Sequence, residues 1–256
     1  MNRISRAATV LCLALALFPA AAAASTEVDH SALDRLLVAH VQGGLVDYAG
    51  LGQETASLDA YLESLARADL AGASREELLA FYINAYNACT LRMILRHYPG
   101  IRSIRDIEDD YGYHQWKTRE WVLAGQTLSL DDMEHEILRK QLEEPRIHFA
   151  IVCASKGCPP LWEHAYSAEN IAAELDMAAG RFLASPQGMA VDRGGNELRV
   201  SRIFDWFKED FTRHGTLLEF IGLYVDDATR AWIFSGDLPD VEYLDYDWSL
   251  NDLDRQ

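Results

Sequence analysis

The stretch SREELLAFYINAYNACTLRMILRHYP, residues 74–99, is the longest helical pattern in the chain. Ser74 suits a helix N-cap, and Glu77 three residues later completes a capping box. Pro99 and Gly100 are typical of a helix end. The middle of the stretch is apolar almost all round, as in a helix buried on every side. We therefore predict a central core helix, around which the rest of the chain packs.

Shorter patterns surround this helix. Two turns that contain glycine indicate β-hairpins over residues 119–130 and 189–201. The run IHFAIVC, residues 147–153, is rich in β-formers and predicts a buried strand. Helices outnumber the short strands, and no repeat or linker interrupts the chain. The sequence thus predicts an α+β fold: a helix-rich single domain with a small mixed or antiparallel sheet and β-hairpins. Further helices are expected over residues 29–41, 57–66, 129–144, 167–183, 202–211 and 217–225.

The N-terminus and the charge indicate where the protein acts. Residues 1–24 combine a basic start, an apolar run and an alanine-rich end, which predicts a secretory signal peptide. Its removal would take away two arginines and no acidic residue, so the formal net charge would move from −17 to −19. We expect an exported protein, periplasmic or secreted, with a single domain over residues 25–256 and no integral membrane segment after cleavage. An acidic surface of this kind argues against nucleic acid as a partner.

The stretch HFAIVCASKGCPPL, residues 148–161, holds two thiols five positions apart, Cys153 and Cys158. Loss of Cys12 with the signal would leave three cysteines, so at least one thiol is unpaired within the chain or pairs with something else. A nucleophile with a helper, a disulfide, a metal site and a redox couple all remain open for such a pair.

A nucleophilic thiol needs a lowered pKa, a base within reach and partial exposure. In a regular strand, alternate residues face opposite sides, so His148 would point away from Cys153. His135, on the predicted helix 129–144, is therefore the expected base. This arrangement would follow the papain-like logic of acyl transfer or amide hydrolysis.

Other polar side chains complete the predicted site. Asn84 or Asn87, from the buried helix, would orient the base, and Glu134 would hold a proton or a substrate amine. Cys158 would resolve or gate the first thiol. A structural role is also open for the asparagines, which could cap a loop end across the core. The expected ligand is a small molecule or a peptide, with no cofactor and no metal.

Two alternatives have different consequences. The chain could be a non-catalytic binding module in which Cys153 and Cys158 form a structural disulfide, although so short a loop gains little stability from bridging. His135 and His148 together with the two cysteines are also competent zinc ligands, but their spacing matches no zinc motif. A labile bridge would instead indicate redox chemistry, although the CxxC spacing of thioredoxin-like proteins is absent.

Six sequence blocks in order resemble the domain of unknown function 547, from about Leu33 to Asn251: VDYAGL, AFYINAYNACTL, LDDMEHEILR, RIHFAIVCASKGCPPL, SRIFDWFKEDF and YDWSLN. The resemblance implies little about activity because the family is uncharacterised. The domain is joined in some proteins to glutaredoxin-like modules, which hints at thiol chemistry. A motif position that is commonly aliphatic is occupied here by Cys89, which is therefore expected to fill the core. The motif residues correspond to Asn84, Asn87, Glu134, His135, His148, Cys153, Cys158 and Pro159.

Overall fold

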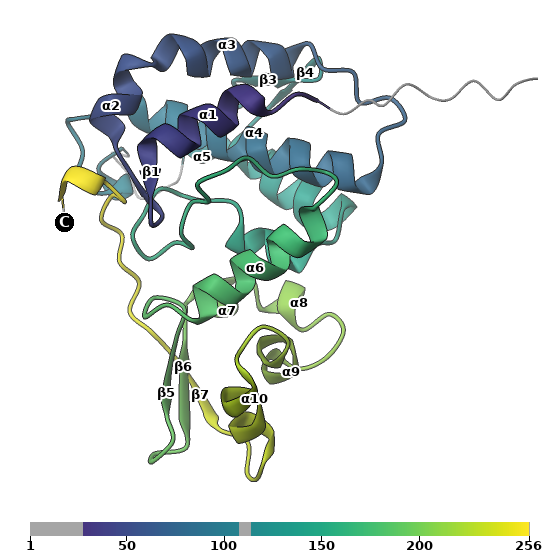
Figure 1. Ribbon diagram of the computed structural model, residues 1–256, viewed down its shortest axis with the longest axis vertical. Coiled ribbons are helices and arrows are strands. Elements are labelled where there is room, and N and C mark those ends of the chain that lie inside the picture. Colours follow the sequence, from purple (N-terminus) through teal and green to yellow (C-terminus); the bar gives the residue numbers. More distant parts are fainter. Residues whose placement is uncertain (1–27, 108–113, 256) are drawn as a thin grey trace, which may run out of the picture.

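The computed structural model describes residues 28–107 and 114–255, so the signal peptide expected over residues 1–24 lies outside the described part. The described chain has the predicted helix-rich α+β fold, in which the strands form small separate sheets. A helical half and a half that contains the largest sheet lie at opposite ends of the long axis, with α6 (Ile171–Leu183) between them (Figure 1).

Helix α4 (Arg75–Leu95) forms the core of the helical half, as the sequence predicted. Ser74 and Glu77 make the predicted capping box, and every residue from Leu79 to Leu91 is buried. Within the described residues, only α4 is long and apolar enough to cross a membrane by those two measures, and 83% of its most apolar window is buried inside the protein. Helix α3 (Thr55–Ala66) packs directly against α4. The same hydrophobic core also takes in residues of α1 (Ser31–His40), β1 (Val41–Gln42), β2 (Leu45–Val46) and α2 (Tyr48–Gln53).

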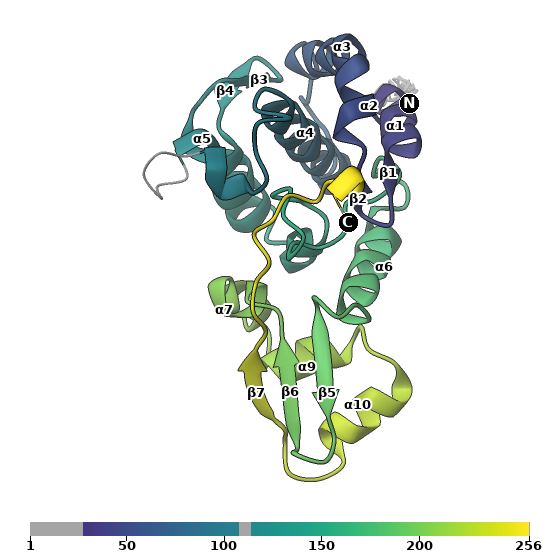
Figure 2. The same ribbon diagram turned by 90° about the vertical axis from the view of Figure 1, so that its left-hand side faces the viewer.

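Both predicted hairpins form. The first consists of β3 (Trp121–Leu123) and β4 (Gln126–Leu128), and its turn at Ala124 and Gly125 has positive φ at both residues. The second consists of β5 (Met189–Asp192) and β6 (Glu197–Val200), and β7 (Asp240–Tyr243) adds to β6 in parallel. The result is a mixed three-stranded sheet. It shares a second, smaller hydrophobic core with α9 (Leu217–Gly222) and α10 (Asp227–Phe234) (Figure 2).

After β7 the chain returns to the helical half, as both ribbon views show (Figures 1 and 2). Isolated antiparallel bridges pair Ser249 with Ser103 and Leu250 with Ser155. The chain then ends in η4 (Leu253–Arg255). This return places the C-terminal segment, residues 244–252, beside the loop that carries the two cysteines.

The prediction of a strand over residues 147–153 is wrong. The segment forms a short 3-10 helix, η3 (Pro145–Phe149), and then an irregular loop. Residues 147–152 are all buried, so apolar side chains mark a core position here and not a strand. The Asn87 side chain bonds the backbone of Ala150 and Val152, where a neighbouring strand would otherwise do so.

Three other predicted helices differ in detail. The helix expected from residue 167 begins at Ile171, and the one expected over residues 202–211 is divided into α7 (Ile203–Trp206) and α8 (Lys208–Phe211). The helix expected over residues 129–144 has the predicted capping pair, in which Ser129 and Asp132 exchange hydrogen bonds. Its turns are those of a π-helix, η2 (Asp132–Gln141). Two short elements precede it along the chain: η1 (Ile104–Ile107) and α5 (His114–Lys117).

Candidate functional site

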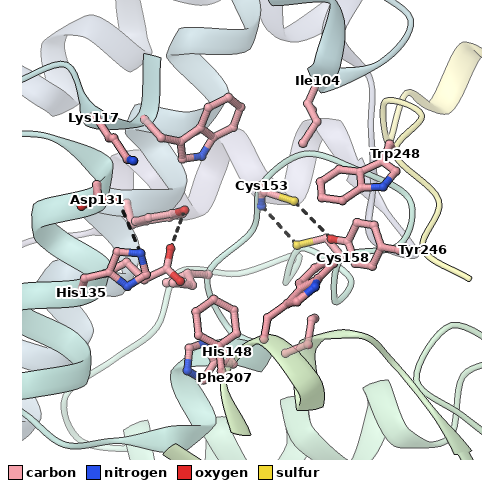
Figure 3. A pocket seen from close by; sticks show the side chains of 16 residues that line it. Ile104, Lys117, Asp131, His135, His148, Cys153, Cys158, Phe207, Tyr246 and Trp248 are labelled. Carbon is pink, nitrogen blue, oxygen red and sulfur yellow. Dashed lines mark hydrogen bonds and ion pairs between the residues drawn. The ribbon is translucent and has the colours of Figure 1, made fainter. Parts of the chain in front are cut away.

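A pocket of about 590 Å³ lies where the two hydrophobic cores meet. Its walls come from α4, η1, α5, η2, η3, the cysteine loop (residues 150–158), α7 and the C-terminal segment. Figure 3 shows Asp131 and His135 at one side of the pocket, with Cys153 and Cys158 at the other. The fold thus brings together most of the residues singled out from the sequence, although they do not all contact one another.

Cys153 and Cys158 are free thiols in neighbouring positions of one loop. The backbone N–H of Cys153 donates to Sγ of Cys158 at 3.2 Å. Sγ of Cys153 lies 3.0 Å from Oγ of Ser155 and 3.4 Å from the hydroxyl of Tyr246, and these two hydroxyls are 2.9 Å apart. The half-buried Cys153 is therefore surrounded by hydrogen-bond donors, whereas Cys158 is buried behind it.

The two thiols have opposite pKa shifts. The hydrogen bond from Cys158 is the largest cause that lowers the pKa of Cys153; burial opposes it, and hydrogen bonds from Ser155 and Tyr246 add to it. The same hydrogen bond, together with burial, raises the pKa of Cys158 well above its ordinary value. Cys153 is thus the thiol of the pair that ionises more readily, and Cys158 is the one that keeps its proton.

The cysteine loop is fixed from two sides. On the core side, Asn87 donates to the carbonyl of Ala150 and accepts from the amide of Val152, at 2.9 and 3.0 Å. On the other side, the amide of Gly157 donates to the carbonyl of Asp247. A Cβ atom at Gly157 would lie 2.8 Å from the backbone nitrogen of Asp247, so this close approach requires glycine.

Glu134 carries a carboxyl group in the pocket wall. The hydroxyl of Tyr86 donates to its Oε2 at 3.2 Å. Burial is the largest cause that raises the pKa of Glu134 from 4.5 to about 7, and the negative charge of Cys153 adds to it. A carboxyl group with such a pKa can hold or release a proton near neutral pH, as general acid–base catalysis requires.

The two histidines belong to a separate network. Nδ1 of His135 lies 2.8 Å from Nη1 of Arg139, and Nε2 of His148 lies 2.7 Å from Oδ2 of Asp210. Arg139 also bonds Asp210, at 2.5 Å. Burial lowers the pKa of both histidines, and that of His148 falls to about 4. Neither histidine has a hydrogen bond to Cys153 among the contacts of the described residues, so the expected Cys153–His135 pair is not formed directly.

The expectation that His148 points away from Cys153 rested on a strand and is also wrong. Because residues 147–153 are not a strand, alternation does not separate His148 from Cys153, and both side chains line the pocket. The His148 ring stacks on Phe207 with 3.9 Å between the ring centroids. Its hydrogen bond goes to Asp210, so His148 belongs to that buried network.

Asn84 and Asn87 bond backbone groups and not a histidine. Asn84 donates to the carbonyl of Tyr166 and accepts from its amide, at 2.8 and 2.9 Å. Asn87 does the same for the loop that leads to Cys153. These contacts match the structural alternative, in which the asparagines cap loops across the core. Cys89 is fully buried, as expected of a residue that fills the core.

Several residues of the site were not identified from the sequence. Tyr246 and Ser155 contact the sulfur of Cys153, Tyr86 contacts Glu134, and Asp210 joins Arg139 to His148. Ser155 stood inside the cysteine stretch, and Tyr246 and Asp210 stood inside blocks quoted for their resemblance. Only the folding of the chain shows which atoms they meet.

No metal cluster is found in residues 28–107 and 114–255, where no three His, Cys, Asp or Glu side chains are placed to hold an ion. The four zinc ligands considered from the sequence therefore do not converge. The two cysteines contact one another, while the histidines face Arg139 and Asp210.

The fold and the site define a helix-rich α+β domain with a pair of thiols in a pocket. Comparison with known families finds one match to part of the chain: the family model described as "Protein of unknown function, DUF547" matches residues 70–183. This match supports the resemblance over α4, η2 and the cysteine loop, and its description names no activity. It does not extend to α7 or the C-terminal segment, which complete the pocket. No curated protein and no solved structure matches the chain.

Proposed function

We propose that this protein is a thiol-dependent oxidoreductase in which Cys153 attacks an oxidised substrate and Cys158 resolves the product. The observation that carries the proposal is the pairing of two free cysteines, in which the Cys153 backbone N–H donates to Sγ of Cys158 and the two thiols have opposite pKa shifts. A low-pKa, partly exposed thiol beside a protonated, buried one is the asymmetry that a two-thiol redox reaction needs.

The reaction balances as follows. The thiolate of Cys153 attacks an oxidised substrate X–Y and bonds to X, while Y leaves with the electron pair and takes up one proton. The Cys158 thiol then attacks the sulfur of Cys153, a disulfide forms, and X leaves with the electron pair and the Cys158 proton. The substrate gains two electrons and the two cysteines lose two. An external dithiol reduces the disulfide and restores the enzyme.

A cysteine-dependent hydrolase or acyltransferase is the second candidate. It is favoured by the presence of a low-pKa thiol and a proton-holding carboxyl group, Cys153 and Glu134, in one pocket. A hydrolase or acyltransferase reaction, however, needs no chemical step from Cys158. Its expected base, His135, has no described contact with the Cys153 thiol. The binding-module alternative requires a bridge between Cys153 and Cys158, whereas both thiols are free here.

The test is controlled oxidation of the protein with diamide, followed by mass mapping of the thiols. The Cys89→Ala background removes the buried core thiol, and Cys158→Ala and Cys153→Ala are compared within it. We expect a Cys153–Cys158 disulfide that an external dithiol reduces. We also expect alkylation of Cys153 to be half-maximal below about pH 7. In Cys158→Ala the alkylation profile should move to higher pH because the main hydrogen bond is lost.

Two results would contradict the proposal. One is a folded protein, by circular dichroism, that never forms the disulfide. The other is an acyl-enzyme on Cys153 from p-nitrophenyl acetate that turns over equally fast in Cys158→Ala, which would make the hydrolase the better assignment. Loss of folding in Cys153→Ala leaves the test intact, because disulfide formation is measured on the protein that retains both thiols.

A further inference from the structure

The atoms around the sulfur of Cys153 restrict the substrate. Oγ of Ser155 and the hydroxyl of Tyr246 both lie within hydrogen-bond distance of this sulfur and of each other. Hydroxyl donors at the point of attack stabilise negative charge that develops on an oxygen atom. The same hydroxyls also stabilise negative charge on the sulfur of Cys153, but a hydroxyl donor bonds an oxygen atom more strongly than a sulfur atom. The donors therefore favour a substrate whose electrophilic atom carries oxygen.

The walls next to the thiols are aromatic. The ring centroids of Tyr246 and Trp248 are 4.5 Å apart, and Trp206 lies 4.8 Å from Tyr246 and 5.6 Å from Trp248. Figure 3 shows Tyr246 and Trp248 beside Cys158. Aromatic rings make favourable contacts with thioether sulfur and with alkyl groups. Hydrogen peroxide, which carries no apolar group, would gain nothing from these walls.

A proton source shares the same cavity. Oxygen bound to sulfur must be protonated before the sulfur–oxygen bond can break, because it is otherwise a poor leaving group. The Glu134 carboxyl lines the pocket, is bonded by Tyr86 and remains partly protonated near neutral pH. A thiolate, hydroxyl donors, aromatic walls and an acid thus surround one cavity.

We infer that the pocket binds and reduces sulfoxides with an apolar substituent, such as a methionine sulfoxide side chain. The inference rests on the proposed two-thiol function, since the oxygen atom must be removed by a second thiol. Tyr246 and Ser155 hold the sulfoxide oxygen, and the aromatic rings hold the groups attached to its sulfur.

The steps balance. The thiolate of Cys153 attacks the sulfoxide sulfur while the oxygen takes one proton from Glu134. The hydroxyl group then passes to Cys153, which becomes a sulfenic acid. The substrate sulfur–oxygen bond and the new bond between the two sulfur atoms break, a bond between Sγ of Cys153 and the oxygen forms, and the sulfide leaves with the remaining electron pair. Cys158 then attacks the sulfur of Cys153, forming the disulfide, and its proton leaves with the hydroxide as water. The sulfoxide gains two electrons, the cysteines lose two, and an external dithiol returns both thiols.

The experiment uses racemic methyl p-tolyl sulfoxide as the probe and chiral chromatography as the readout. With dithiothreitol present, the protein should consume one enantiomer faster than the other, because fixed donors and rings position the oxygen. Without dithiothreitol, a single turnover should give one sulfide for each Cys153–Cys158 disulfide formed.

Tyr246→Phe tests the hydroxyl, and Tyr243→Phe, in the same C-terminal part of the chain, is its matched control. At a pH where Cys153 is fully ionised, the loss of one oxyanion donor should slow sulfoxide reduction about 10²-fold. Alkylation of Cys153 at that pH should stay near the wild-type rate, and Tyr243→Phe should change neither rate.

The outcomes separate the two proposals. If diamide gives the disulfide but the wild-type protein yields no sulfide, the sulfoxide inference is overturned while the two-thiol function stands. If diamide gives no disulfide, both fail. Equal consumption of both enantiomers, together with an unchanged rate in Tyr246→Phe, would overturn the assignment of the oxygen to these hydroxyls.

Discussion

Replacing Asn87 by leucine should both destabilise the protein and change the reactivity of Cys153. Asn87 is 2% exposed, and its amide satisfies the carbonyl of Ala150 and the amide of Val152, which are themselves buried. Leucine has a similar shape but bonds neither group. Each unsatisfied backbone group costs about 1–3 kcal/mol, so the free energy of unfolding should fall by about 2–6 kcal/mol.

Asn84→Leu is the matched control. Asn84 is equally buried in the same helix and bonds two backbone groups of Tyr166 in the same way, so its loss should cost a similar free energy. Tyr166 is outside the pocket lining, whereas Ala150 and Val152 lead directly to Cys153. Only Asn87→Leu should therefore loosen the contact between the thiols and shift the alkylation of Cys153 to higher pH.

Two assays read these effects. Urea denaturation, followed by tryptophan fluorescence, gives the free energy of unfolding, and alkylation without denaturant gives the pH profile of Cys153. A change in stability below about 0.5 kcal/mol for Asn87→Leu would refute the claim that these two bonds hold the loop. An equal shift of the pH profile in Asn84→Leu would show general loosening and refute a specific role for Asn87.

Two further predictions concern Glu134 in the pocket wall and Asp210 in the network behind it. The folded protein raises the pKa of Glu134 from 4.5 to about 7, so this carboxyl favours folding below about pH 4.5 and loses up to about 3 kcal/mol as pH rises to 7. The wild-type protein should therefore lose stability relative to Glu134→Gln over that range in denaturation at pH 4.5 and pH 8, and parallel curves would contradict this. Asp210→Asn should cost about 3–5 kcal/mol because it leaves Arg139 without its buried partner. In thermal or urea unfolding at pH 7, the more exposed Asp205→Asn should change stability by less than about 0.5 kcal/mol, and an equal effect of both changes would refute the special place of Asp210.

Most of the fold could be predicted from helical periodicity and capping signals in the sequence. The middle of residues 74–99 is apolar almost all round and is stable only when buried on all sides, so the central helix was predictable from local sequence. The hairpins were predictable because their glycine-containing turns have backbone conformations that few other residues adopt. The segment 147–153 was mistaken because a fully buried irregular segment and a buried strand have the same composition.

The site was predictable only in part. Cys153 and Cys158 lie in one short loop, so their proximity depends only on local sequence and the pair could be identified from it. Their chemistry depends on Tyr246, which is 93 positions from Cys153. The sequence also could not show that Asn87 bonds the backbone of the cysteine loop, or that His135 faces Arg139.

The sequence by itself determined the helix-rich α+β fold, the buried helix and the presence of a two-thiol loop. These features depend on residues that are neighbours in the chain and on simple periodic burial. The tertiary structure decided which thiol is ionised, which acid shares its pocket and what surrounds its sulfur. A pKa or a hydrogen bond is set by the atoms within a few ångströms, and in this protein those atoms come from the cysteine loop, α4, η2 and a C-terminal segment that returns across the fold.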